Sequence, residues 1–261
     1  MDILDAYTRG GPDPQAVLDI FKGEWSSRMP ADLGAVSTPG QAALFEDARI
    51  DWLAERIGGF AGRSVLELGP LEAGHTTMMA RGGAARIVAV EGNSRAYLKC
   101  LCIKELLGLS TCSFVHADIE AYLETCEEDF DLSVLSGVLY HMTDPCRMLE
   151  LAIRRSRRLY IWTHYFDAGR VAALGAGARQ FGRPTTLVHR GRSYQASRRS
   201  YGQALGWRGF CGGRSEHAYW LTRESLHRLV EDLGCRVVAT AHDDPAHPNG
   251  PALSLYCERD A

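Results

Sequence analysis

The feature that most constrains the fold is a short apolar run that breaks into a glycine-containing loop. The run spans residues 65–68, lies between Arg63-Ser64 and Gly69, and is typical of a buried strand. The loop continues to Gly74, where a helix is expected to begin. In doubly wound α/β proteins, a strand, loop and helix of this kind hold a nucleotide-like ligand. The ligand lies past the carboxyl end of the strand, against exposed backbone N–H groups.

A second apolar run supports this interpretation. Residues 86–90 lead directly into Glu91, which lies 24 residues after Glu67. A carboxylate at the tip of the second strand, roughly 20 residues on, can accept hydrogen bonds from ribose hydroxyls. The loop lacks the G-x-G-x-x-G spacing of a dinucleotide site. Nicotinamide cofactors and S-adenosylmethionine both carry a ribose, so both stay open here. The alternative for Glu91 is a solvated carboxylate at a strand end.

Four features, taken together and in this order, resemble class I S-adenosylmethionine-dependent methyltransferases. They span roughly residues 60–163 and are Glu67-x-Gly69, Glu91 after its strand, Ala117-Asp118 after Phe114-Val115, and the strand Phe130 to Ser136. Within that superfamily, the stretch from Gly137 to Pro145 resembles the wobble-uridine tRNA methyltransferase group and its uncharacterised small-molecule relatives. One departure is clear. Leu71 and Ala73 stand where the usual Glu-x-Gly-x-Gly-x-Gly loop has its second and third glycines.

The resemblance implies an α/β fold with a doubly wound, mostly parallel seven-stranded sheet, helices on both faces and a reversed last strand. Residues 1–57 are expected to form an N-terminal helical arm, with an amphipathic piece from Gln15 to Lys22, Trp25 as a packing anchor and a helix from Gln41 to Ile57. Residues 58–164 and 221–261 would form the Rossmann-like core, and residues 165–220 an insert that caps the substrate site. Periodicity and capping residues predict the other elements: helices at 74–82, 94–107, 119–125, 145–154 and 222–233, and strands at 112–116, 130–135, 157–163, 235–240 and 252–257.

The resemblance also implies S-adenosyl-L-methionine as the cofactor. The residues expected to bind it occupy the loop and the strand tips: Glu67, Gly69, Glu72, Gly74, His75, Glu91, Gly92, Asn93, Asp118, Ile119, Ser136 and Gly137. Asp118 is placed for the adenine amino group, although it could also cap the helix at 119–125. Gly137 would let the backbone approach the ligand closely.

The tips of the fourth and fifth strands supply the candidates for the reaction side, which are Tyr140, His141, His164 and Tyr165. His141 could take a proton from the nucleophile, because its ordinary pKa lies close to neutral. Alternatively, His141 and Asp144-Pro145 only set the turn into the next helix. A sulfonium carries its own activation, so a methyltransferase mainly has to align the nucleophile and exclude water.

The insert concentrates positive charge. Residues 165–220 hold nine arginines and no lysine against Asp167 and Glu216, a net charge of +7, which leaves −10 for the rest of the chain. Arginine binds carboxylate or phosphate and stacks on rings. Six aromatic residues would add walls: Tyr194, Tyr201, Trp207, Phe210, Tyr219 and Trp220. This composition favours a cap that selects an acidic or aromatic acceptor. Alternatively, the insert is a solvent-exposed segment or a dimer contact. A possible RNA contact is also suggested by two short polar, arginine-containing stretches, Gly191-Arg192-Ser193 and residues 197–200.

Bulk properties narrow the class of protein. The net charge of −3 argues against a nucleic-acid binder that uses its whole surface. The absence of a long apolar run argues against a membrane helix, and the absence of a basic leader argues against secretion. The eight scattered cysteines contain no C-x-x-C pair, so a cytoplasmic protein without a metal site is expected.

The leading hypothesis is methyl transfer to an O or N nucleophile of a small acidic or aromatic metabolite, by a chain that is a possible homodimer. The alternatives are a tRNA-modifying methyltransferase, a nicotinamide oxidoreductase, and a non-catalytic cofactor-binding regulator.

Overall fold

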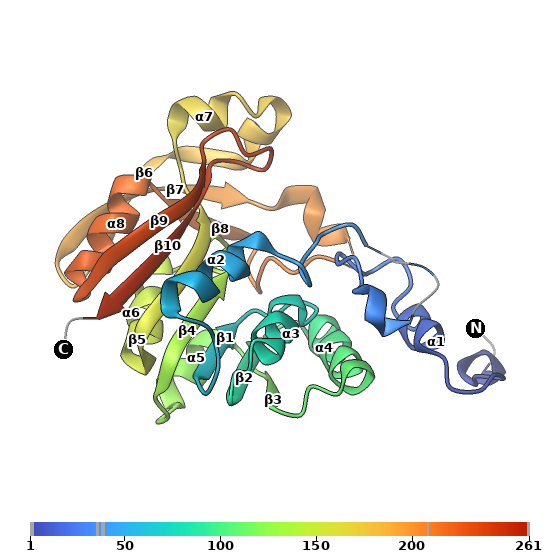
Figure 1. Cartoon of the computed structure of the whole chain (residues 1–261). Helices are drawn as coiled ribbons and strands as arrows, with labels where there is room; N and C mark the ends of the chain where they lie inside the picture. The colour runs from blue at the N-terminus through green and yellow to red at the C-terminus, as the bar shows by residue number, and fades with distance from the viewer. Residues whose placement is uncertain (1–2, 35–36, 38–39, 208, 260–261) are drawn as a thin grey trace.

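The computed structural model describes residues 3–34, 37, 40–207 and 209–259. A seven-stranded sheet crosses the molecule in the order β3-β2-β1-β4-β5-β10-β9 (Figure 1). Its strands are β1 (Ser64–Leu68), β2 (Arg86–Glu91), β3 (Cys112–His116), β4 (Phe130–Ser136), β5 (Ser156–His164), β9 (Cys235–Asp244) and β10 (Ala252–Arg259). The first five strands are parallel to one another. Strand β10 lies antiparallel between β5 and β9, which confirms the expected reversed strand.

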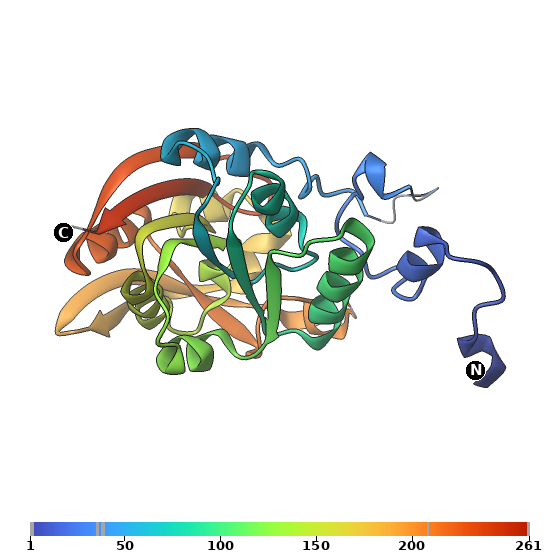
Figure 2. The ribbon, with the colours of Figure 1, turned by 60° about the horizontal axis from the view of Figure 1, so that its bottom comes forward.

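Helices cover both faces of the sheet (Figure 2). Apolar side chains of α1 (Pro14–Asp19), α2 (Ala48–Ile57), α3 (Gly74–Arg81) and α4 (Ser94–Leu107) pack in one core cluster. Those of α5 (Ile119–Thr125), α6 (Pro145–Arg155) and α8 (Arg223–Asp232) pack in the other. Side-chain caps begin several of these helices as predicted. Asn93 accepts from the N–H groups of Arg95 and Ala96, and Thr222 accepts from that of Ser225.

One predicted helix is shorter than expected. Helix α2 begins at Ala48, because the side chain of Asp47 caps it by accepting a hydrogen bond from the N–H of Arg49 at 2.9 Å. The residues from Gln41 to Asp47 are not helical, and Ala42 forms an isolated bridge with Ser27. The prediction that this helix starts at Gln41 was therefore wrong. The apolar residues Ala43 and Leu44 suggested a helical period that the cap at Asp47 interrupts.

The N-terminal arm, residues 3–34, reaches away from the sheet before it returns to helix α4 (Figures 1 and 2). Trp25 is buried, and its indole Nε1–H donates to the carbonyl of Leu18 at 2.8 Å. It is the packing anchor that the sequence predicted. Among the described residues, no helix has both the length and the apolar character needed to cross a bilayer.

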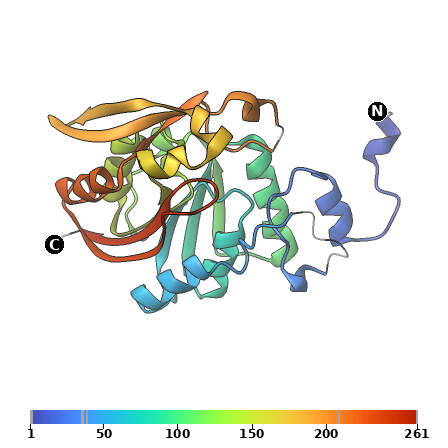
Figure 3. The same ribbon diagram turned by 90° about the horizontal axis from the view of Figure 1, so that it is seen from above.

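The insert contains a second sheet that the sequence did not predict. Strands β6 (Phe181–His189), β7 (Arg192–Ser200) and β8 (His217–Leu221) form an antiparallel sheet, preceded by the short helix α7 (Ala168–Ala172). Figure 3 shows its long hairpin beside helix α8. Tyr194, expected to face a ligand, is instead buried, and its hydroxyl donates to Asp232 at 2.8 Å.

The arginines at the tip of this hairpin are held by carboxylates. The Arg190 guanidinium pairs with Glu150 at 2.7 Å, and that of Arg192 pairs with Asp232. The stretch Gly191-Arg192-Ser193, expected as a possible RNA contact, therefore spans the end of the hairpin turn and the start of β7, and the two arginines beside the turn have partners within the chain.

Candidate functional site

A cavity of about 850 Å³ lies where the carboxyl ends of β1, β2 and β4 meet the insert. Most of the predicted cofactor residues line it: Gly69, His75, Glu91, Gly92, Asn93, Asp118, Ile119, Ser136 and Gly137. Two of the predicted reaction-side residues, Tyr140 and His141, line it as well. Parallel strands bring their carboxyl ends to the same edge of a sheet, so residues distant in sequence converge there.

Glu91 is held by the backbone around it. One carboxylate oxygen accepts from the N–H of Leu71 at 3.1 Å, and the other accepts from the N–H of Asn93 at 2.8 Å. Burial raises the pKa of Glu91, while these backbone hydrogen bonds oppose the rise. A carboxylate offers about four lone-pair positions. Glu91 therefore keeps the capacity to accept further hydrogen bonds from a ligand in the cavity.

The loop between β1 and α3 follows a glycine-like path without its glycines. Leu71 has φ +55° and Ala73 has φ +62°, and both values lie in the left-handed region that glycine normally occupies. The family glycines are thus replaced in sequence but not in backbone conformation. A non-glycine residue in this region costs about 1–2 kcal/mol, so the surrounding contacts must hold the loop in place.

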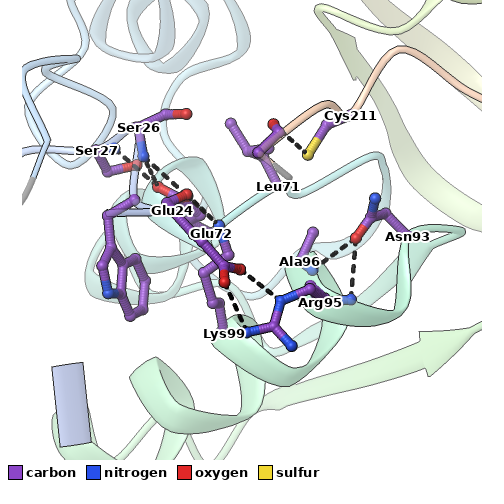
Figure 4. Close-up of polar contacts among 12 residues, drawn as sticks. Glu24, Ser26, Ser27, Leu71, Glu72, Asn93, Arg95, Ala96, Lys99 and Cys211 are labelled. Carbon is purple, nitrogen blue, oxygen red and sulfur yellow. Dashed lines mark hydrogen bonds and ion pairs between the residues drawn. The ribbon is translucent and has the colours of Figure 1, made fainter. Parts of the chain in front are cut away.

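Glu72 supplies those contacts (Figure 4). Its carboxylate is fully buried and accepts from the N–H groups of Ser26 and Ser27 at 3.0 and 2.8 Å. It also pairs with the ammonium of Lys99, an N···O distance of 2.6 Å, and that ammonium donates to the carbonyl of Glu24 at 2.7 Å. Glu72 was predicted to bind the cofactor, but it faces away from the cavity. It fastens the N-terminal arm to the loop.

Two further predicted cofactor residues also lie outside the cavity wall. The carboxyl group of Glu67 is buried and accepts from the hydroxyl of Thr76, and burial raises its pKa to about 7. Gly74 lies against the backbone of Leu44, where an added Cβ would come within 2.6 Å of the carbonyl oxygen. Like Glu72, these residues support the loop from behind. Their expected direct contacts with a ligand do not agree with their positions.

Asp47, Arg49 and Trp162 form a part of the site that the sequence analysis missed. Asp47 pairs with the Nε2 of His75 at 2.8 Å and with the guanidinium of Arg49. Burial pushes the pKa of Asp47 upward, but hydrogen bonds from His75 and Arg49 hold it well below its usual range. The Arg49 guanidinium lies 4.1 Å from the ring centre of Trp162, and both side chains line the cavity. The position of Trp162 one strand over from Ser136 could have indicated its orientation.

Tyr140 and His141 occupy the turn after β4. Burial raises the pKa of Tyr140 to about 12 and lowers that of His141 to about 3, so both groups are neutral near pH 7. The Nδ1 of His141 lies 2.6 Å from the hydroxyl of Tyr201 in the insert and shares a hydrogen bond with it. Asp144 caps helix α6 and Pro145 begins it, so the turn-setting alternative also holds for these two residues. Asp118 likewise caps α5.

The expected place of His164 and Tyr165 at the substrate side was wrong. Neither residue lines the cavity. The ring of His164 stacks on Trp220 with 4.9 Å between centroids, and its Nδ1 lies 2.8 Å from the carbonyl of Gly250. Tyr165 is buried, and its N–H donates to the carbonyl of Pro251 at 2.9 Å. The end of β5 lies against the segment before β10, and the ring of His164 packs edge to face on Tyr140 with 4.6 Å between centroids.

The insert closes the other side of the cavity with Arg199, Tyr201, Trp207, Phe210 and Arg214. Arg214 is exposed and lies 3.4 Å from Asp118. Arg199 is half-buried, and its guanidinium lies 4.8 Å from the ring centre of Trp220. Trp220, expected as a ligand wall, is fully buried beneath this arginine.

No protein-family model matches the chain. A curated relative, the tRNA U34 carboxymethyltransferase of Marinobacter nauticus, is 29% identical over 164 residues, which cover 60% of this chain and 49% of that protein. The chain therefore spans about half the length of the curated relative it matches.

Solved structures are similar over most of the chain. The N-terminal domain of EvdMO1 with SAH bound has a TM-score of 0.59 at 23% identity and covers 83% of this chain and 82% of its own. The magnesium protoporphyrin IX methyltransferase of Synechocystis PCC 6803 with bound SAH has a TM-score of 0.59 at 14% identity, with 95% and 100% covered. The chain therefore shares the fold of these proteins, as the resemblance seen in the sequence implied.

Proposed function

We propose that the chain transfers a methyl group from S-adenosylmethionine to an O or N nucleophile of a small acidic or aromatic metabolite. The proposal rests mainly on the position and orientation of the Glu91 carboxylate. It stands at the tip of β2, in the wall of the cavity, with its two oxygens oriented by backbone N–H groups. A fold of this class places a ribose-binding acid at this strand tip.

The other residues of the wall fit the same cofactor. Asp118 and Ile119 lie after β3, where the adenine would lie, and Gly69 and Gly137 leave room for close backbone approach. Asp118 caps α5 through one oxygen, and its other oxygen, which lies 3.4 Å from the Arg214 guanidinium, has a further lone pair that could accept from an amino group. When bound, the cofactor supplies an activated methyl group.

The residues of the chain would then align the acceptor and exclude water. Tyr140 and Trp162 are packed edge to face with 5.9 Å between centroids, and together they wall the part of the cavity beside Gly137. His141, neutral and hydrogen-bonded to Tyr201, can orient an acceptor hydroxyl or amine by a hydrogen bond to its remaining ring nitrogen, whereas its lowered pKa makes it a weak base. Orientation of the nucleophile is the larger contribution, because the leaving sulfide needs no proton.

A tRNA substrate is the second candidate, favoured by the similarity to the tRNA U34 carboxymethyltransferase. Two observations support a small acceptor instead. The N-terminal arm and the insert both contribute to the cavity wall, and the arginines at the hairpin tip pair with Glu150 and Asp232. A gel-shift series over a range of salt concentrations would distinguish the two candidates, since phosphate contacts give a steep salt dependence.

Parallel calorimetric titrations with S-adenosylmethionine, S-adenosylhomocysteine and NAD test the proposal. We expect binding of both sulfur compounds and none of NAD. Absence of binding by both sulfur compounds would refute the methyltransferase proposal. Binding without consumption of S-adenosylmethionine in the presence of acidic aromatic acceptors would favour a regulatory protein.

A further inference from the structure

Three arginines among the described residues line the cavity, and they differ in their partners. Arg49 pairs with Asp47, and Arg214 lies within ion-pair distance of Asp118. Arg199 has no such partner, because no carboxylate in the described parts of the chain lies within ion-pair distance of it. Its Nε–H donates to the amide oxygen of Gln180 at 3.1 Å. The other four N–H donors of the guanidinium make no hydrogen bond to a described residue.

The surroundings of Arg199 make a charged guanidinium without an anionic partner unfavourable. The guanidinium lies against the rings of Trp220 and Tyr201, with 4.8 and 5.8 Å to their centres. The ionisable groups that face it from neighbouring elements are all neutral near pH 7, and they are Tyr140, His141, His164 and Tyr201. Burial lowers the pKa of Arg199, which reflects the loss of hydration around the charge. A desolvated cation of this kind is strongly stabilised by an anion.

The position of Arg199 indicates which ligand carries the anion. Arg199 projects from the insert toward Tyr140 and His141, at the part of the cavity formed by the tip of β4. Glu91 and Asp118, which follow β2 and β3, mark the cofactor part. Aromatic side chains stand next to Arg199. Phe210 packs on Tyr201 with 4.9 Å between centroids, and Trp162 lies on the Tyr140 side.

We propose that Arg199 binds an oxyanion, a carboxylate or a phosphate, attached to a planar ring of the acceptor, and thereby determines acceptor specificity. The proposal rests on the proposed function, and it adds the group that distinguishes acceptors from non-acceptors. A planar guanidinium makes two parallel hydrogen bonds to either anion. The ring would lie between the aromatic walls, with its nucleophile directed toward Gly137.

Three probes of matched shape test the proposal on the full chain saturated with S-adenosylhomocysteine. Benzoate and phenyl phosphate carry the two anions, and benzamide is the neutral isostere. Binding can be followed by tryptophan fluorescence, because Trp162 and Trp207 line the cavity. We expect at least one anionic probe to bind roughly tenfold or more tightly than benzamide, which is the size of effect expected for a charge-assisted hydrogen bond. Comparison of benzoate with phenyl phosphate shows whether the site prefers a carboxylate or a phosphate.

Arg199→Gln should remove this preference, whereas Arg198→Gln should keep it. Arg198 is the neighbouring residue on β7, is exposed and lies outside the cavity wall, so its variant makes the same change in net charge. Arg199→Lys should retain part of the preference, because it keeps the charge without the planar fork.

Each outcome has a distinct meaning. If the wild-type chain binds benzamide as tightly as both anions, the proposal is refuted without recourse to any variant. It is also refuted if Arg199→Gln binds S-adenosylhomocysteine normally and keeps the preference. Failure of the wild type to bind S-adenosylhomocysteine would instead refute the proposed function.

Discussion

The two ends of the cavity are built in different ways. At the cofactor end, Glu91, Asn93 and Asp118 each accept a hydrogen bond from a backbone N–H two or three residues further on. Glu91 also accepts from the N–H of Leu71, and the side chain of Asn93 donates to the carbonyl of Phe210. At the acceptor end, Tyr140, Trp162 and Arg199 come from two strand tips and the insert, and they meet only through tertiary packing. The first end is therefore built mainly from features that the fold supplies, whereas the second depends on contacts that are specific to this chain. Four variants test this contrast.

The largest effect, on stability, is expected at the buried ion pair between Lys99 and Glu72, which supports the loop at the cofactor end. Lys99→Met would leave the carboxylate of Glu72 buried without its cation, which typically destabilises a protein by about 3–5 kcal/mol. Urea denaturation would measure the loss. Arg81→Met is the control, because Arg81 pairs with Asp32, both side chains are exposed, and an exposed pair contributes little. Equal losses in the two variants would contradict the anchoring role of Glu72.

Glu91→Ala should weaken the binding of S-adenosylhomocysteine by about 10–100-fold, the range expected for lost hydrogen bonds to a charged group. Calorimetry measures this directly. Arg199→Gln should leave this affinity close to that of the wild type, because Arg199 belongs to the acceptor end. Unchanged affinity in Glu91→Ala would refute its role toward the ribose.

Glu67 makes the support of the loop sensitive to pH. Its pKa is about 7 in the folded chain, against an ordinary value of 4.5, because burial disfavours the charged form. Between pH 4.5 and about pH 7, the folded state therefore binds more protons than the unfolded state. The contribution of Glu67 to the free energy of unfolding falls as pH rises through this range. Glu67→Gln removes the titration. Its stability relative to the wild type should increase by about 1–3 kcal/mol from about pH 5 to about pH 7.5.

Urea denaturation at the two pH values checks this prediction. The exposed residue Glu55 provides the control, since Glu55→Gln should show no such trend. A flat difference for Glu67→Gln would mean that Glu67 is ionised throughout this range.

The smallest effect is expected at Leu71. Leu71→Gly removes the energetic cost of a left-handed backbone at a non-glycine residue, but it raises the conformational entropy of the unfolded chain. A net stabilisation of up to about 1 kcal/mol is therefore expected. Thermal unfolding would detect it. Leu107→Gly, at the end of helix α4, should have the opposite sign because glycine is a poor helix former. Destabilisation by Leu71→Gly would show that the leucine side chain contributes more than its backbone costs.

The same contrast explains how much the sequence could predict. Apolar runs that end in Glu91 and Ser136 identified the strands, and Asn93 and Asp144 identified helix starts, because each of these signals acts over a few residues. The fold and most of the cofactor end followed from them. The positions of Glu67, Glu72 and Gly74 behind the loop did not, since they depend on Thr76, Lys99 and Leu44 respectively.

The acceptor end was harder to predict for a physical reason. Strand β7 carries Arg, Ser or Gln at seven of its nine positions, and β6 contains Gly182 and Pro184, so neither shows the apolar alternation that marks a strand. Their pairing is fixed by the hairpin turn at Gly191 and by packing of Tyr194 on α8. The position of His164 was hard to predict because it is the last residue of β5, and its ring is held by the carbonyl of Gly250 and by stacking on Trp220, both distant in sequence.

The contact between Glu72 and the backbone of Ser26 and Ser27 has a thermodynamic consequence. It connects the arm to the loop that faces the ligand, and coupling between two such events is reciprocal. Whatever factor the docked arm adds to ligand affinity, the bound ligand adds to the docking of the arm. The arm is thus a built-in reporter of occupancy, and its rate of proteolytic cleavage would fall as the cavity fills.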